Sequence, residues 1–302
     1  MDYSTPNVIH RRERAERRWA ALVTERPELE PSVQIQRRLV LPTLAALDQL
    51  ATSTDALPSF PEAYIRAKLG RGVPALRGET IPPAVEILGP LLREFADILA
   101  DGGAGDAARH VREAYDGGAI DAASWLTTSL ARDRRRILSG ANQMSLAPDL
   151  LWLIGELAAA PLAHLLACSA LDGLSDLPGA WSRGLCPACG SWPALAERTA
   201  TTHVLRCSFC GWGWARQSAH CTYCGEREFL GLRAPLADRP GHLLEFCTGC
   251  GGYLKTIDVT DALVFPLATI EDLATSDLDV AALDTGFHRP DLPDDGDEPS
   301  DR

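Results

Sequence analysis

Eight of the nine cysteines in this chain of 302 residues fall into four pairs with the spacing Cys-x-x-Cys. Nine cysteines scattered by chance through such a chain would produce fewer than one pair of this kind, so the pattern indicates a shared function. A glycine follows every pair, where the chain of a metal knuckle must turn tightly toward the sulfur atoms. The pairs with their glycines are Cys186, Cys189 and Gly190; Cys207, Cys210 and Gly211; Cys221, Cys224 and Gly225; and Cys247, Cys250 and Gly251.

Four thiolates complete one tetrahedral metal site, so eight cysteines predict two sites. The first two pairs are separated by 17 residues, within the usual spacing of a zinc ribbon, and the last two by 22 residues. Consecutive pairing is also favoured because the same order of segments occurs twice. A knuckle is followed by a predicted strand that begins at His203 in the first occurrence and at His242 in the second, then by another knuckle and an aromatic strand. These features predict two tandem rubredoxin-like or zinc-ribbon modules, and an interleaved pairing of the knuckles stays open.

The alternatives to metal binding are disulfides and a redox-active Cys-x-x-Cys motif. A thioredoxin-type motif opens a helix within a βαβ pattern, whereas short β-like segments flank these pairs. No secretory signal is visible, so we expect a cytoplasmic location, where disulfides are rare. Metal binding is therefore predicted, and the sites should be structural because protein ligands fill all four positions. Four thiolates accept Zn(II) or iron, so the identity of the metal stays open.

Residues 1–181 predict an all-α bundle, because apolar residues recur three or four positions apart and Gly, Pro or Asp mark the breaks. This region contains no phosphate-binding glycine motif, nucleophile elbow or paired-histidine metal motif, and we predict no catalytic residues in the chain. The predicted helices cover approximately residues 8–26, 32–50, 61–69, 83–99, 106–115, 125–138 and 148–171.

Several other conspicuous features are interpreted as structural. The arginine-rich segments 11–18 and 132–136 are predicted to be solvated helix faces, and Cys168 to be a small core residue in an apolar helix. His203 and His242 are interpreted as strand positions rather than as groups that support the metal ligands. The apolar region 146–171 has no uncharged stretch of about 20 residues, so we expect buried helices and no membrane span.

The net charge of −12 is unevenly distributed. Residues 257–302 carry 2 basic and 13 acidic side chains, and residues 284–302 predict a disordered acidic tail. The knuckle region, 182–256, carries 8 basic and 5 acidic side chains. This excess is small beside the basic patches of nucleic-acid-binding proteins. Nucleic acid is therefore not the expected partner, and a nucleic-acid-binding zinc ribbon is kept as an alternative function.

Four Cys-x-x-Cys-Gly knuckles behind a helical region resemble the formate dehydrogenase accessory protein family, FdhE. The arginine-rich first helix, from His10 to Trp19, is also similar to that family. The matching segments near the C-terminal side are Cys-Pro-Ala-Cys-Gly-Ser-Trp-Pro (186–193), Leu-Arg-Cys-Ser-Phe-Cys-Gly-Trp (205–212), Cys-Thr-Tyr-Cys-Gly (221–225) and Glu-Phe-Cys-Thr-Gly-Cys-Gly-Gly-Tyr-Leu-Lys (245–255).

The resemblance implies a cytoplasmic accessory protein, not an enzyme, that contacts the catalytic subunit of a respiratory formate dehydrogenase before its export. It also implies that the eight paired cysteines bind metal, with iron in rubredoxin-like sites. A rubredoxin-like electron carrier is a further alternative, because a single iron can pass one electron. The predicted organisation is α plus small β: a helical domain at 1–181, metal ribbons at 182–218 and 219–270, and the acidic tail at 284–302.

Overall fold

The computed structural model of the chain describes residues 8–53, 57–174, 181–216, 220–226, 230–235 and 239–292. Contacts group the chain into two compact units, and the chain passes between them after residues 61, 75 and 172. The first unit is helical, and the second contains α3 (Glu62–Gly70), a six-stranded sheet and two further helices. The predicted fold class, a helical N-terminal region followed by a small β region, is confirmed.

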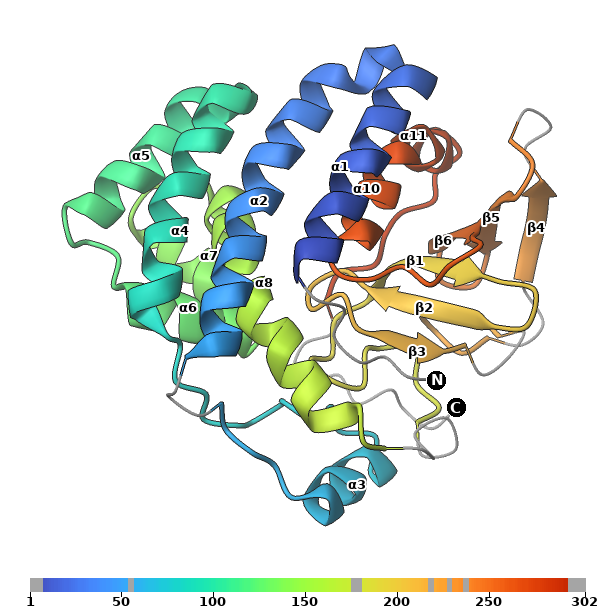
Figure 1. Cartoon of the computed structure of the whole chain (residues 1–302), viewed down its shortest axis with the longest axis horizontal. Helices are drawn as coiled ribbons and strands as arrows, with labels where there is room; N and C mark the ends of the chain where they lie inside the picture. The colour runs from blue at the N-terminus through green and yellow to red at the C-terminus, as the bar shows by residue number, and fades with distance from the viewer. Residues whose placement is uncertain are drawn as a thin grey trace. The chain divides into compact units, whose positions relative to one another are not determined.

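The helical unit is built around α8 (Pro148–Leu171), which packs against α2, α4, α6 and α7 (Figure 1). Among the described residues, α8 is the one helix long and apolar enough to cross a membrane, and 78% of its most apolar window is buried. An apolar surface all round the helix is typical of a central core helix. The other elements are α1 (Val8–Glu25), η1 (Pro27–Leu29), α2 (Glu30–Thr52), α4 (Val85–Leu99), η2 (Ala100–Ala104), α5 (Gly105–Asp116), α6 (Ala122–Leu130) and α7 (Arg134–Gln143).

The single helix predicted over 125–138 is wrong, because the structure has two helices there, α6 and α7. Arg132 lies between them with a φ of 63°, a left-handed conformation that ends a helix. Asp133 then caps α7, since its side chain accepts a hydrogen bond from the backbone N–H of Arg136 at 3.0 Å. Ile137 follows Leu130 by seven positions, about two helical turns, so the spacing of these two apolar residues alone does not reveal the break.

Two arginines predicted to lie on solvated helix faces are buried. Arg11 in α1 is 1% exposed, and its guanidinium donates a hydrogen bond to Nε2 of His164 in α8 at 3.0 Å. Arg132 is paired with Glu156 of α8 at 2.5 Å and stacks on the ring of Trp152. A long arginine side chain can bury its apolar stem and still pair its charged head. Both residues therefore fasten their segments to the core helix.

One mixed sheet of six strands, in the order β3-β2-β1-β6-β5-β4, organises the second unit (Figure 1). The first ribbon contributes an antiparallel meander of β1 (Pro193–Arg198), β2 (His203–Cys207) and β3 (Gly213–Ala215). The second ribbon contributes β4 (Leu230–Pro235), β5 (His242–Cys247) and β6 (Tyr253–Asp258). In each ribbon a knuckle precedes the first strand and another separates the second strand from the third.

The two ribbons share one sheet, because β1 and β6 pair in parallel, with Ala196 opposite Thr256. The rings of Trp192 and Tyr223, one from each ribbon, also meet edge to face with their centroids 5.2 Å apart. The backbone N–H of Ala75, which follows α3, donates to the carbonyl of Pro187 in the first knuckle at 2.7 Å. These contacts tie both ribbons and the α3 segment into one unit.

Two helices, α10 (Leu267–Ala274) and α11 (Ser276–Asp284), follow the sheet and pack on one of its faces. Neither is predicted from the sequence, because both are short and acidic residues interrupt their apolar periodicity. The buried side chains at this contact are Leu244, Tyr253, Leu278 and Ala282, with Phe246 and Phe287 packed against them.

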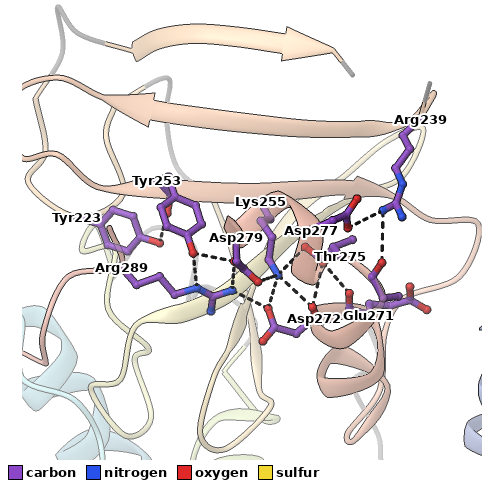
Figure 2. Close-up of polar contacts among 11 residues, drawn as sticks. Tyr223, Arg239, Tyr253, Lys255, Glu271, Asp272, Thr275, Asp277, Asp279 and Arg289 are labelled. Atoms are coloured by element: carbon purple, nitrogen blue, oxygen red, sulfur yellow. Dashed lines mark hydrogen bonds and ion pairs between the residues drawn. The ribbon is translucent and has the colours of Figure 1, made fainter. Parts of the chain in front are cut away.

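A polar group that we call the Lys255 cluster fastens these helices to the sheet (Figure 2). Lys255 of β6 is fully buried, and its Nζ lies 2.7 Å from a carboxylate oxygen of both Asp272 and Asp279. Arg289 contacts the same two carboxylates at 2.7 and 2.9 Å, and the hydroxyl of Tyr253 donates to Asp279 at 2.7 Å. Burial raises the pKa of Asp272, but Arg289 and Lys255 outweigh this effect and the pKa is lowered overall. The cluster therefore keeps this carboxylate ionised beside both cations.

Residues 285–292 belong to the segment predicted to be a disordered tail, but they are ordered against the sheet unit. His288 forms a parallel β-bridge with Gly252, and Arg289 belongs to the Lys255 cluster. The backbone carbonyl of Asp291 accepts a hydrogen bond from the indole of Trp192 at 2.8 Å. The prediction of disorder is therefore wrong for these residues, and residues 293–302 lie outside the described part of the chain.

The Lys255 cluster leads to a prediction about stability. Replacing Asp279 by asparagine is expected to lower the free energy of unfolding of the sheet unit by about 3 kcal/mol, because Lys255 keeps only one carboxylate partner. Adding Lys255→Met should recover most of this loss, since the unbalanced buried cation is then removed. Denaturant titration of the full metal-loaded chain measures both effects.

The matched control for this prediction is Asp277→Asn, on the same helix. Its carboxylate pairs with Arg239 at 3.3 Å and its side chain is 42% exposed, so the substitution should cost at most about 1 kcal/mol. If the two charges were independent, the double variant would lose as much free energy of unfolding as Asp279→Asn and Lys255→Met lose together. That result would contradict the prediction.

Candidate metal centres

The sulfur atoms of the first two knuckles converge in the first ribbon. Cys189 Sγ lies 3.4 Å from the Sγ of Cys207 and 3.7 Å from that of Cys210, and the Sγ atoms of Cys186 and Cys210 are 3.7 Å apart. All four sulfur atoms lie within 4.8 Å of one another. We call Cys186, Cys189, Cys207 and Cys210 the first cluster.

The last two knuckles bring their sulfur atoms together in the second ribbon. The Sγ atoms of Cys221 and Cys250 are 3.8 Å apart, and those of Cys224 and Cys247 are 3.7 Å apart. These four cysteines, which also lie within 4.8 Å of one another, form the second cluster. The predicted pairing of consecutive knuckles is confirmed, and the interleaved arrangement is excluded.

Both clusters have the size of a tetrahedral metal–thiolate site. With metal–sulfur bonds of about 2.3 Å, neighbouring sulfur atoms of a regular tetrahedron lie about 3.8 Å apart. The closest sulfur contacts measured here, from 3.4 to 3.8 Å, are near this length. A disulfide would bring two sulfur atoms to about 2.05 Å, and all eight cysteines are free thiols. The residues therefore fit a divalent ion such as Zn(II) or Fe(II), and the donor set does not distinguish the two.

The four knuckles share one backbone design. In each, the N–H of the first cysteine donates to the carbonyl five residues later, as from Cys186 to Ser191 at 2.9 Å. The glycine after each pair has a φ between 66° and 81°, which side chains with a Cβ resist. The turn also directs backbone N–H groups at sulfur, as those of Phe209 and Cys210 toward Cys207 at 3.4 Å. Such hydrogen bonds favour the thiolate, which is the form that binds metal.

Burial makes thiolates in these clusters costly without an opposing charge. It raises the pKa of Cys186 and Cys210 well above that of an ordinary thiol, and the pKa of Cys250 to about 11. Burial also acts to raise the pKa of Cys247, but hydrogen bonds beginning with the backbone N–H of Cys250 outweigh it and the pKa is lowered. A bound metal cation supplies the positive charge that stabilises four thiolates this close together.

The two clusters differ in their exposure to solvent. The four cysteines of the first cluster are all between 0% and 4% exposed. In the second cluster Cys221 and Cys247 are buried, but Cys250 is only half-buried and Cys224 is exposed. The first cluster is therefore enclosed by protein, whereas the second opens to the surface at the second cysteine of each knuckle.

The remaining candidates from the sequence lie away from the clusters. His203 and His242 begin β2 and β5, at the ends of these strands opposite to the cysteines. Four extended residues span about 13 Å, so these rings do not contact the ligands from the strand ends. Cys168 is in α8, where burial raises its pKa to about 12, which is the opposite of an activated thiol.

Sequence reasoning missed a buried ion pair beside the first cluster. Arg206, which precedes Cys207, donates to a carboxylate oxygen of Glu197 at 2.5 Å, and their side chains are 5% and 1% exposed. The other carboxylate oxygen of Glu197 accepts the backbone N–H of Leu263 at 2.7 Å. No local pattern marks these residues as buried, because strands 193–198 and 203–207 mix charged and apolar side chains.

Comparison with other proteins identifies relatives of this chain by sequence and by structure. No family model matches the chain. The protein named FdhE homolog of Stutzerimonas stutzeri (strain A1501) is 32% identical over 150 residues, which are 48% of each chain. The FdhE homolog of Edwardsiella ictaluri (strain 93-146) is 30% identical over 133 residues, or 41% of each chain. The chain thus matches about half the length of these relatives or less.

The structural similarity extends further than the sequence alignments. The crystal structure of the FdhE protein from Pseudomonas aeruginosa matches 92% of this chain and 94% of its own, with a TM-score of 0.57 and 25% identity. The match therefore includes most of both units, not the cysteine region alone. Together with the two four-cysteine clusters, these matches make the chain similar to FdhE proteins in sequence over about half its length and in fold over most of it.

Proposed function

We propose that this chain is an accessory protein for the maturation of a respiratory formate dehydrogenase. In this role it binds the catalytic subunit of that enzyme in the cytoplasm, before export. The observation that carries the proposal is the presence of two complete four-cysteine clusters in a chain similar to FdhE proteins. Binding is favoured over catalysis, because a cluster whose four cysteines all bind metal leaves no open position for a substrate.

We infer that each cluster holds one metal ion. The ligands are Cys186, Cys189, Cys207 and Cys210 in the first, and Cys221, Cys224, Cys247 and Cys250 in the second. The bound ion neutralises the thiolates and, if it is iron, can exchange one electron. Because each ion joins two knuckles from distant parts of its ribbon, it holds the ends of the strands together. A sheet fixed in this way offers a partner a rigid surface, which lowers the cost of ordering on binding.

The test is an anaerobic pull-down of the tagged chain from the cytoplasm of its own cells. Mass spectrometry identifies the captured proteins, and metal analysis is performed on the same eluate. We expect the wild-type chain to recover a formate dehydrogenase catalytic subunit and to carry metal. The Cys186→Ser/Cys189→Ser variant should lose the catalytic subunit and one of the two metal ions, because half of the first cluster's ligands are missing.

The matched control is Cys168→Ser, which alters the one cysteine outside the clusters and should preserve metal and partner. Equal recovery of the catalytic subunit by the double-serine variant would contradict a metal-dependent role. Recovery of nucleic acid or of unrelated enzymes by the wild type, without the catalytic subunit, would overturn the proposed function and leave only the metal sites.

A further inference from the structure

The difference in exposure between the two clusters has an identifiable origin in the sequence. Knuckles two and four have the same backbone design, Cys-Ser-Phe-Cys and Cys-Thr-Gly-Cys, so Phe209 and Gly249 occupy equivalent positions. Phe209 is 2% exposed, and its backbone N–H lies 3.4 Å from the Sγ of Cys207 in the first cluster. Gly249 has no side chain and is exposed. Within the part of the chain that the structure describes, the second cluster therefore has no aromatic side chain at the position that Phe209 occupies beside the first.

The surroundings of the neighbouring glycines show the same contrast. The ring of Phe265, itself buried, packs so closely on Gly211 that a Cβ there would lie 2.6 Å from it. At the equivalent Gly251 the nearest neighbour is the ring of His288, which is polar and exposed. Two buried aromatic residues, Phe209 and Phe265, thus lie at the second knuckle of the first cluster. A glycine and a histidine border the second cluster at the corresponding place.

We propose that the second cluster is the exchangeable metal site of the chain, whereas the first holds its metal permanently, and that Phe209 and Gly249 set this difference. The inference rests on the proposed binding of one metal ion by each cluster. The apolar shell around a metal site controls the access of solvent and competing ligands. A chelator or a thiol-bearing metal carrier reaches the second cluster at the exposed Cys224 and at the exposed Gly249, which has the polar side chain of Glu226 as its neighbour. In the described structure all four cysteines of the first cluster are buried, so a chelator reaches them through local opening of the sheet.

The test follows metal release from the full chain loaded anaerobically with Zn(II). The chelator 4-(2-pyridylazo)resorcinol reports released zinc by its colour, and total zinc is measured beforehand. We expect two equivalents, released in two phases of equal amplitude whose rates differ by at least about tenfold. In the Cys224→Ser/Cys250→Ser variant the fast phase should be absent and about one equivalent should leave slowly.

Gly249→Phe gives the more specific test, because it places beside the second cluster the residue type that Phe209 provides beside the first. A Cβ at Gly249 would lie 3.6 Å from the nearest atoms, which is ordinary contact, and the backbone there is not left-handed. The variant should therefore fold, and the fast phase should slow by about tenfold. Gly249→Ala is the matched control, since a methyl group covers little and should leave the fast phase unchanged.

The outcomes of this experiment distinguish metal binding by both clusters from faster metal exchange at the second. Fewer than two zinc equivalents in the wild-type chain would contradict metal binding by both clusters, and so the function proposed above. Two equivalents that leave at one rate would overturn the inference of an exchangeable second cluster and keep the metal sites. If Gly249→Phe did not slow the fast phase, the side chain at this position would not determine how readily the chelator reaches the second cluster.

Discussion

Refolded without metal, the chain is expected to form its helical unit and to leave the sheet unit unfolded. In zinc-finger peptides metal binding contributes about 10–16 kcal/mol, as much as the whole net stability of a typical domain, about 5–15 kcal/mol. The helical unit has its own apolar core around α8. Hydrogen exchange with mass spectrometry, after refolding in chelator, should show rapid exchange in β2 and β6 and protection in α8.

The same measurement after refolding with two equivalents of Zn(II) should restore protection of the sheet. Cys186→Ser/Cys189→Ser should leave at least the first ribbon unprotected even with zinc, because two ligands are missing. Cys168→Ser, which changes a thiol outside the clusters, should behave as the wild type. Protection of β2 and β6 in chelator equal to that with zinc would contradict a metal-dependent fold of this unit.

Arg206→Met is expected to be the most destabilising single substitution in the sheet outside the cysteines and glycines of the knuckles. Among the described residues, it leaves the Glu197 carboxylate, 1% exposed, with the backbone N–H of Leu263 as its remaining hydrogen-bond donor. Removing one member of a buried ion pair costs about 3–5 kcal/mol. Denaturant titration of the zinc-loaded chain, followed by a signal from the sheet unit, measures the loss.

A second ion pair in the same sheet provides the control. Arg198 and Asp258 are joined by hydrogen bonds of 2.6 and 3.0 Å, but their side chains are 40% and 47% exposed. Arg198→Met should therefore cost no more than about 1 kcal/mol. If the two variants lost equal stability, burial would not be the reason for the large effect of Arg206.

The metal centres were the part most open to prediction from the sequence. A knuckle is a local structure, because its two cysteines and its glycine lie within five residues and enforce one turn. The consecutive pairing could also be predicted, since the order of knuckles and strands repeats along the chain. The sequence also contains the contrast between Phe209 and Gly249, to which we attribute part of the difference in exposure between the clusters.

The parts that were missed depend on contacts between distant segments. The parallel pairing of β1 and β6 joins strands from the first and second ribbons, and neither strand carries a local sign of its partner. The order of residues 285–292 depends on Arg289 reaching the Lys255 cluster, whereas composition alone suggests an acidic tail. The burial of Arg11 likewise follows from its partner His164, which lies far along the chain.

The most direct test of the two metal centres is X-ray absorption spectroscopy of the purified chain, combined with quantitative metal analysis. Two ions per chain, each surrounded by four sulfur atoms at about 2.3 Å, are predicted from the two clusters. The Cys224→Ser/Cys250→Ser variant should keep one ion with the same four-sulfur signature. A single ion in the wild-type chain, or nitrogen and oxygen ligands in place of sulfur, would contradict two complete four-cysteine sites.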